Sequence, residues 1–258
     1  MANLGAPIAA SKRERGVARL LSLLAQLHQH DRPMRVVDLA KALDAPRSTI
    51  YELVAALTDA GLLEFSSNGK EVFFGKLMHL YGASYLRENE LIRRGAAEVD
   101  RLSRASGETC ELCVLHHNRQ AIIHMHPGAR PQRISSEVGA QIPLPWTASG
   151  RLLLSQASAA DIEALIAPGD LFLPDGRTLA LSAFVDECHA ARGMASIVTK
   201  GLINSLTQCL AAPVWDTDRR LVATICMVLP IDVPESHVTN WTSELIASSR
   251  ALSLDAQN

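Results

Sequence analysis

The sequence predicts an α+β protein whose N-terminal part is a winged helix-turn-helix. Two helical patterns lie close together and are separated by a very short turn. A proline and a glycine mark the two ends of the second helix, and a β-hairpin pattern follows it directly. After Gly107 the composition changes to β-rich runs that alternate with short helical patterns. This second part is predicted to be a mixed α+β domain built around one sheet.

The first helix of the motif is recognised from its apolar spacing. Val36, Leu39, Ala40 and Leu43 recur at positions i, i+3, i+4 and i+7, which places them on one face of a helix. The next two residues, Asp44-Ala45, are too few for anything but a turn.

The second helix begins at Pro46, which suits a first helical position because its missing N–H costs nothing there. Gly61 is placed to end it. One face is predicted to be buried, and it carries Ile50, Leu53, Val54 and Leu57. The opposite face is polar near the N-terminus, with Arg47, Ser48, Thr49, Tyr51 and Glu52.

The hairpin pairs Leu63 and Phe65 with Val72 and Phe74 across residues 67–70, which include the strong turn signal Asn-Gly. A helix, a turn, a helix with an exposed polar face and a hairpin together predict a unit whose second helix enters a DNA major groove. The alternative is an ordinary packing unit with a solvated polar face.

Six side chains are candidates for DNA contact. Arginine pairs with guanine, serine and threonine bind phosphate or a base edge, and tyrosine contacts phosphate or a thymine methyl group. Alternatively Thr49 caps the helix, Tyr51 packs in the core, and the hairpin tip is a solvated turn. The candidates are Arg47, Ser48, Thr49 and Tyr51 on the helix, and Asn68 and Lys70 at the hairpin tip.

Composition narrows the class of protein. The 258 residues are 48% hydrophobic and 20% charged, as in ordinary globular chains, and the 4% aromatic content disfavours single-strand binding by stacking. Residues 1–76 carry ten basic and eight acidic residues, net +2, whereas the whole chain is −2. No apolar run of membrane-spanning length and no signal-peptide pattern occurs, and the five cysteines suit free thiols in a reducing cytoplasm.

The domain organisation follows from these patterns. We expect a flexible tail over 1–14, a winged helix-turn-helix over 15–75 that includes an amphipathic helix ending near His30, a linker helix over 76–94 and a further domain over 95–258. The amphipathic helix that ends near His30 has its apolar positions at Val17, Leu20, Leu21, Leu24 and Leu27. These positions are expected to pack in the core or to form a dimer interface.

The last domain is predicted to begin with a helix over 95–105. Strands are then expected at 109–115, 120–125, 134–138, 195–200, 206–215 and 221–229, with a hairpin turn at 116–119. Helices are expected at 151–155, 161–166, 183–192 and 234–252.

Four stretches in this order resemble the isocitrate lyase regulator (IclR) family of bacterial transcription factors. They are LAKALDAPRSTIYELVAALTDAGLLE (39–64), SGETCELCVL (106–115), SSEVGAQIPLPWTASGRLLLS (135–155) and CLAAPVWDTDRRLVATICMVLP (209–230). The resemblance extends from about residue 13 to 254.

The resemblance implies a GAF-like effector-binding domain after the linker helix. It implies a homodimer or tetramer that binds a palindromic double-stranded operator, with affinity modulated by a small organic or aromatic acid. It also implies a protein without enzymatic activity or cofactor. It leaves open the effector, the operator and whether the regulator activates or represses.

Family pocket positions that match this sequence predict the effector site. They fall on Trp146, Ala148, Ser149, Thr207, Cys209 and Cys226. The loop-to-helix junction at 147–150 would offer free N–H groups to a carboxylate. Cys226 and Val228 share a strand face and can line one cavity. The alternative is that both cysteines are small core hydrophobes.

The sequence departs from the family in two places. Glu52 stands where recognition helices often carry a basic residue, so the bases that are read differ. Residues 195–208 are lengthened, with Lys200 as the single charge where the family usually has an acidic stretch, so the effector pocket is expected to be distinctive.

The sequence offers two other possible functions. A metal- or thiol-responsive regulator would use Cys110 and Cys113, but on a strand this spacing points to opposite faces. His124 and His126 share a face, where they could ligate a metal, although hydrogen-bonded histidines are commoner. A small-molecule enzyme is disfavoured because no Gly-x-Ser-x-Gly, His-Glu-x-x-His or phosphate-loop motif occurs.

Overall fold

The structure is a computed structural model that describes residues 12–129 and 137–253. The chain divides into two compact units, 1–88 and 89–258. Residues 1–11 of the predicted tail lie outside the described residues. Within the described residues, no helix is long and apolar enough to cross a membrane.

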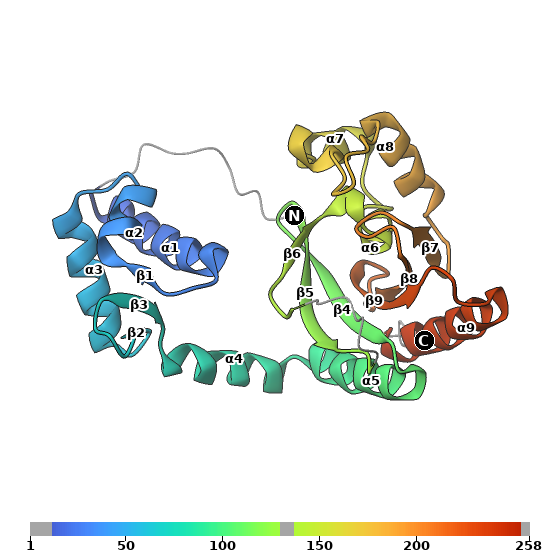
Figure 1. The fold of residues 1–258 in the computed structure, drawn as a ribbon, viewed down its shortest axis with the longest axis horizontal. Coiled ribbons are helices and arrows are strands. Elements are labelled where there is room, and N and C mark those ends of the chain that lie inside the picture. The colour runs from blue at the N-terminus through green and yellow to red at the C-terminus, as the bar shows by residue number, and fades with distance from the viewer. Residues whose placement is uncertain (1–11, 130–136, 254–258) are drawn as a thin grey trace. The chain divides into compact units, whose positions relative to one another are not determined.

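The N-terminal unit has the predicted winged helix-turn-helix order (Figure 1). Its elements are α1 (Lys12–His30), β1 (Met34–Arg35), α2 (Val36–Ala42), α3 (Arg47–Asp59), β2 (Leu63–Phe65), β3 (Glu71–Phe74) and α4 (Lys76–Glu88). Leu63 pairs with Phe74 and Phe65 with Val72, as predicted. The short strand β1 was not predicted, and it pairs with β3 beside β2.

The core of this unit is apolar and joins α1, α2, α3 and the sheet. Its fully buried members include Leu23, Leu27, Leu39 and Ile50. The predicted face of α2 is correct, because Val36, Leu39 and Ala40 are buried and Leu43 packs against them. The predicted face of α3 is also correct, because Ile50, Val54 and Leu57 are buried and Leu53 packs against them.

Only part of the predicted apolar face of α1 lies in the core of this unit. Leu23 and Leu27 are buried, whereas Val17 and Leu21 are 58% and 59% exposed. In a leucine-rich helix several apolar stripes fit the same spacing, and the neighbouring elements decide which of them is buried.

The two ends of α3 follow the sequence with one correction. Pro46 is the residue before the helix and has extended backbone angles, rather than the first helical residue. Gly61 ends the helix with a φ of +75°. That left-handed conformation favours glycine because it has no Cβ.

The predicted helix over 76–94 is interrupted at Asn89, so α4 ends at Glu88 and α5 (Glu90–Ser106) begins at Glu90. The Oδ1 atom of Asn89 accepts a hydrogen bond from the Ile92 N–H at 3.1 Å. This is the bond that a helix N-cap makes. The predicted stop at Gly107 is correct, with a φ of +73°.

In the C-terminal unit, the described residues form one antiparallel sheet in the order β6-β5-β4-β9-β8-β7 (Figure 1). The strands are β4 (Thr109–His116), β5 (Arg119–His126), β6 (Gln141–Pro143), β7 (Ile197–Lys200), β8 (Thr207–Trp215) and β9 (Leu221–Pro230). Helices α5 and α9 (Glu235–Leu252) cover one face, and α6 (Ala148–Leu153) covers the other. Helices α7 (Ala159–Leu165) and α8 (Leu181–Ala190) pack together beyond α6.

Most predicted elements of this unit are present, with bounds shifted by a few residues. Two predictions need correction. Of the strand expected at 134–138, residues 134–136 lie outside the described residues and 137–138 are not in a strand, whereas β6 was missed. The helix expected at 151–155 begins at Ala148, and only Thr147 separates it from a 3-10 turn over Leu144–Trp146.

Candidate functional site

The polar face of α3 is accessible, as its sequence predicted. Arg47 and Ser48 are exposed, Thr49 is half-buried and the Tyr51 side chain is 50% exposed. No side chain caps α3, so Thr49 does not act as its cap. Tyr51 lies outside the core cluster of this unit. The face therefore presents a guanidinium and three hydroxyl groups, next to the carboxylate of Glu52.

The hairpin tip is folded around Asn68. Its Oδ1 atom accepts hydrogen bonds from the Ser66 hydroxyl at 2.7 Å and the Lys70 N–H at 2.9 Å, and its Nδ2 atom donates to Glu71. Gly69, with a φ of +66°, completes the turn. Asn68 therefore shapes the turn, whereas Lys70 is exposed and offers a cation at the tip.

The C-terminal unit holds a small cavity on the face of the sheet that α6 covers. It measures about 60 Å³. Its wall is formed by strands β4 to β9, the turn before α6 and the loop after β7. The lining residues are Glu111, Gln120, Ile142, Trp146, Thr147, Thr199, Gly201, Leu202, Ile203, Thr207, Cys209 and Val228.

The predicted effector residues fall into two groups. Trp146, Thr207 and Cys209 line the cavity. Ala148, Ser149 and Cys226 are buried and lie outside its lining. The Ser149 Oγ atom lies 2.7 Å from Cys226 Sγ, so these two side chains join α6 to β9.

The cavity is also lined by residues that the sequence did not predict, among them Glu111, Gln120 and Thr199. The sequence did contain a signal for Glu111. This acidic residue interrupts an apolar β-rich run, and alternation along the strand places it on the same face as Cys113. The unusual stretch 195–208 supplies Thr199, the loop residues 201–203 and Thr207 to the lining, so the departure from the family pattern falls on this cavity.

Three of the four N–H groups at the expected carboxylate site, those of Thr147, Ala148 and Gly150, have partners within the protein. The Thr147 Oγ1 atom accepts the Gly150 N–H at 2.9 Å, and the Thr147 N–H donates to Leu144. The Ala148 N–H contacts the Cys209 sulfur. These donors are therefore used within the protein.

Three thiols lie on this side of the sheet, on β4, β9 and β8. Cys113 and Cys226 are buried, and Cys209 is half-buried. Contact with Cys226, together with burial, holds the pKa of Cys113 and of Cys209 well above the usual range. Cys113 and Cys209 are therefore poor nucleophiles and serve as small apolar residues.

The candidate metal ligands His124, His126 and Cys110 do not form a metal centre in the described residues. His124 Nε2 lies 3.0 Å from Asp100, and His126 Nδ1 lies 3.0 Å from the Ser103 hydroxyl, so both contact α5. Cys110 and Cys113 belong to core clusters on opposite faces of the sheet, as predicted. Over residues 12–129 and 137–253, no group of three potential ligands is placed to hold a metal.

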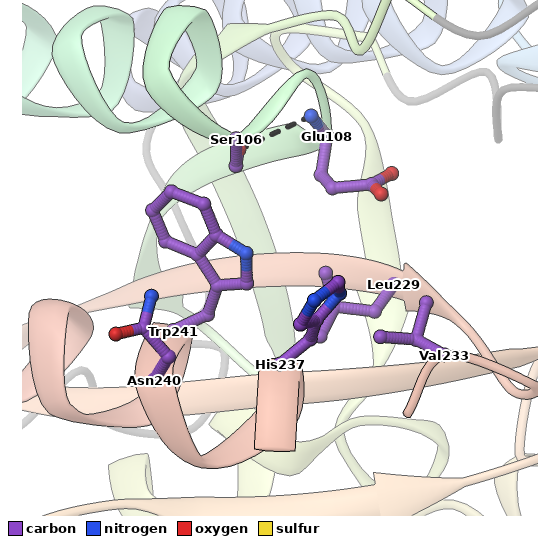
Figure 2. A pocket seen from close by; sticks show the side chains of 7 residues that line it. All are labelled: Ser106, Glu108, Leu229, Val233, His237, Asn240 and Trp241. Atoms are coloured by element: carbon purple, nitrogen blue, oxygen red, sulfur yellow. Dashed lines mark hydrogen bonds between the residues drawn. The ribbon is translucent and has the colours of Figure 1, made fainter. Parts of the chain in front are cut away.

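A second cavity of about 290 Å³ lies between the end of α5, the end of β9 and the start of α9. Trp241, His237 and Asn240 extend from α9 on one side of it, and Ser106 and Glu108 lie on the other (Figure 2). It is larger than the cavity beside α6. None of the predicted effector residues lines it.

Two family models match the chain and together cover most of it. The model described as "Bacterial transcriptional regulator IclR C-terminal" matches residues 83–254, and the "IclR helix-turn-helix domain" matches residues 16–67. The chain belongs to the IclR family.

Curated relatives agree with this assignment. This IclR-family chain is 30% identical to the glycerol operon regulatory protein of Streptomyces griseus over 219 residues, 83% of this chain and 84% of that protein. It is 23% identical to the transcriptional repressor IclR of Escherichia coli K12, over 92% and 88% of the two chains.

Solved structures share the fold. An IclR regulator from Alicyclobacillus acidocaldarius has a TM-score of 0.79 at 19% identity, over 93% of this chain and 97% of that one. An IclR homologue from Microbacterium hydrocarbonoxydans, solved in complex with 4-hydroxybenzoate, has a TM-score of 0.76 at 20% identity, over 93% and 98%. The IclR-family relatives are DNA-binding transcriptional regulators and not enzymes.

Proposed function

We propose that two copies of this regulator bind a palindromic operator through α3 and the hairpin tip, and that a small molecule in the cavity beside α6 modulates that binding. The proposal places the regulator in the cytoplasm. The observation that carries the DNA-binding part is the accessible polar face of α3 within a complete winged helix-turn-helix.

The side chains of α3 support specific roles. Arg47, in the first turn, has the geometry to pair bidentately with a guanine. Ser48, Thr49 and Tyr51 would contact phosphate or a base edge. Lys70 would neutralise a phosphate beside the groove, whereas Asn68 would act by shaping the tip. Glu52 would accept a hydrogen bond from a cytosine amino group, or exclude a phosphate.

A second copy of the chain is the proposed partner of α4. No residue of α4 is buried, although it carries Leu80, Tyr81, Tyr85 and Leu86. Exposed apolar faces of this kind mark interaction surfaces. Because α4 directly follows the DNA-binding elements, effector binding that alters its pose would change half-site spacing and thereby operator affinity.

The effector is proposed to occupy the smaller cavity because three of the predicted positions, Trp146, Thr207 and Cys209, line it. A volume of about 60 Å³ is far below the several hundred Å³ usual for ligand sites, so binding would displace side chains such as Leu202 and Ile203. The family resemblance suggests an organic or aromatic acid. Among relatives, one is bound to 4-hydroxybenzoate and others are named for a glycerol operon, which adds a polyol as a second class.

The test is substitution of Arg47. Operator DNA is first selected by the protein from a random duplex library, and affinity is then measured by fluorescence anisotropy. We expect Arg47→Ala to weaken binding by about 10- to 100-fold, because a bidentate arginine–guanine contact contributes about 1–3 kcal/mol. Its exposed position predicts unchanged folding.

Arg250→Ala is the matched control, since Arg250 is an exposed arginine on α9 in the other unit. It removes the same charge and should leave operator affinity unchanged. Equal affinities of the Arg47 variant and the parent would contradict the assignment of α3 as the DNA-reading helix.

A further inference from the structure

A buried amide oxygen without a hydrogen-bond partner lies at the cavity. Gln120, on β5, lines the cavity and is only 3% exposed. Its Oε1 atom is buried, and no described residue donates to it. Buried polar atoms are nearly always hydrogen-bonded, so this oxygen calls for a donor from outside the protein.

The neighbouring thiol fixes which way the amide faces. Gln120 Nε2 lies 3.2 Å from Cys113 Sγ, and Cys113 Sγ lies 3.7 Å from Glu111 Oε2. A carboxylate accepts, so the single thiol proton is donated to Glu111 or to the adjacent Cys226. Gln120 must then donate to the sulfur, and its oxygen is left for the cavity.

The lining is also unsuited to an anion. None of the described lining residues is cationic, and Glu111 is acidic. Nearby cations already have partners. Arg119 pairs with Asp170, Arg151 pairs with Glu187, and Arg177 pairs with Asp175 and donates to the Gly201 carbonyl. Lys200 alternates with the lining residue Thr199 along β7 and therefore points to the other side of that strand.

We propose that the effector is an uncharged compound with a hydroxyl group, and that this hydroxyl donates to Gln120 Oε1. A carboxylate offers no proton to this oxygen and finds no cationic side chain in the described lining. The proposal rests on the proposed function, because it specifies the ligand of the cavity assigned there. It selects an alcohol, polyol or phenol over the acid that the family resemblance suggests.

The test compares alcohols with carboxylates of the same carbon skeleton. Benzyl alcohol and benzoate form one pair, which differs in both charge and donor. Glycerol and glycerate form a second pair, which differs mainly in charge because both members carry hydroxyl groups. Binding to the full chain is measured by thermal shift and calorimetry at millimolar ligand. We expect the alcohol of a pair to bind at least tenfold more tightly than the carboxylate.

Two glutamine variants locate the donor contact. Gln120→Met preserves the approximate length of the side chain and removes the acceptor, so it should weaken alcohol binding by about 3- to 10-fold, the usual range for one hydrogen bond. Gln208→Met is the matched control. Gln208, on β8, is 2% exposed and also has an unpartnered Oε1 atom, but it does not line the cavity.

The outcomes separate this inference from the proposed function. Tighter binding of a carboxylate, equal effects of the two glutamine variants, or no binding by either pair would each overturn the hydroxyl assignment. Those results would leave operator binding by α3 intact, because the Arg47 experiment requires no ligand. If Arg47→Ala had no effect while alcohol binding depended on Gln120, the DNA-reading assignment alone would fail.

Discussion

Gly150 lies where the cavity wall meets the first turn of α6, and the main chain of Leu144 passes directly against it. A Cβ atom on this residue would lie 2.0 Å from the Leu144 carbonyl oxygen and 2.7 Å from its carbonyl carbon. These are backbone atoms, so a rotamer change cannot relieve the contact. Because Trp146 and Thr147 lie between the two residues, any shift would also disturb the cavity lining.

We therefore expect Gly150→Ala to destabilise the C-terminal unit by about 3 kcal/mol, the upper range for overpacking. All three tryptophans, Trp146, Trp215 and Trp241, belong to residues 89–258, so urea unfolding followed by tryptophan fluorescence reports on this unit. Gly169→Ala is the control, since nothing lies within 4 Å of a Cβ there. A Gly150→Ala midpoint equal to that of the control would contradict the close approach.

Single residues also show how far the sequence could predict the site. The exposure of Arg47 and Tyr51 could be predicted because helical periodicity separates a polar from an apolar face within one element. The position of Gln120 in the cavity wall could not be predicted, because the wall is completed by β6, which pairs with β5, and by the loop after β7. Ser149 and Cys226, both predicted to bind ligand, contact each other, and this contact depends on how α6 packs on the sheet.

At the scale of elements, α5 holds two acidic side chains, Asp100 and Glu98, whose pKa values are lowered by their hydrogen-bond partners. Hydrogen bonding to His124 lowers the pKa of Asp100. Hydrogen bonding to Arg101 lowers the pKa of Glu98, which also accepts a hydrogen bond from the Ser248 hydroxyl of α9. Asp100 therefore ties α5 to β5, and Glu98 ties it to α9.

This arrangement predicts a loss of stability in acid. A carboxyl with a depressed folded-state pKa stabilises the fold above its unfolded pKa, about 3.9 for Asp, and that contribution disappears as the pH falls through the lower folded value. We expect Asp100→Asn to flatten the decline of unfolding free energy below about pH 4. Asp186→Asn on α8 is the control, because Asp186 is exposed. An unchanged acid slope in Asp100→Asn would exclude the ion pair as its source.

The boundaries of the elements also depend partly on local sequence and partly on contacts with distant residues. The break before α5 had a local signal, since asparagine followed by Glu90 suits an N-cap, but the continuous apolar pattern of 76–94 obscured it. The start of α6 at Ala148 depends on the Thr147 cap, also a local signal. Strand β6 has only three residues and exists because β5 offers it an edge, which no local pattern reveals.

At the scale of the whole molecule, the N-terminal unit leaves apolar side chains uncovered. Val17 and Leu21 on α1 lie one turn apart and are both exposed. Tyr81 and Tyr85 on α4 have the same spacing and are 58% and 60% exposed. Exposed apolar stripes of this kind are expected at an interface, and we infer that a second copy covers both; the proposed palindromic operator would require the same symmetry.

Substitution of Tyr81 tests whether α4 is part of a dimer interface. Tyr81→Glu places a charge within the apolar stripe of α4, and we expect it to shift the protein from dimer to monomer in sedimentation and to weaken binding to a palindrome by at least tenfold. Affinity for a single half-site should be nearly unchanged, because α3 is not altered. His79→Glu introduces the same side chain on the opposite side of the helix and should leave the dimer intact. A Tyr81→Glu protein that remains dimeric would show that α4 is not part of the interface.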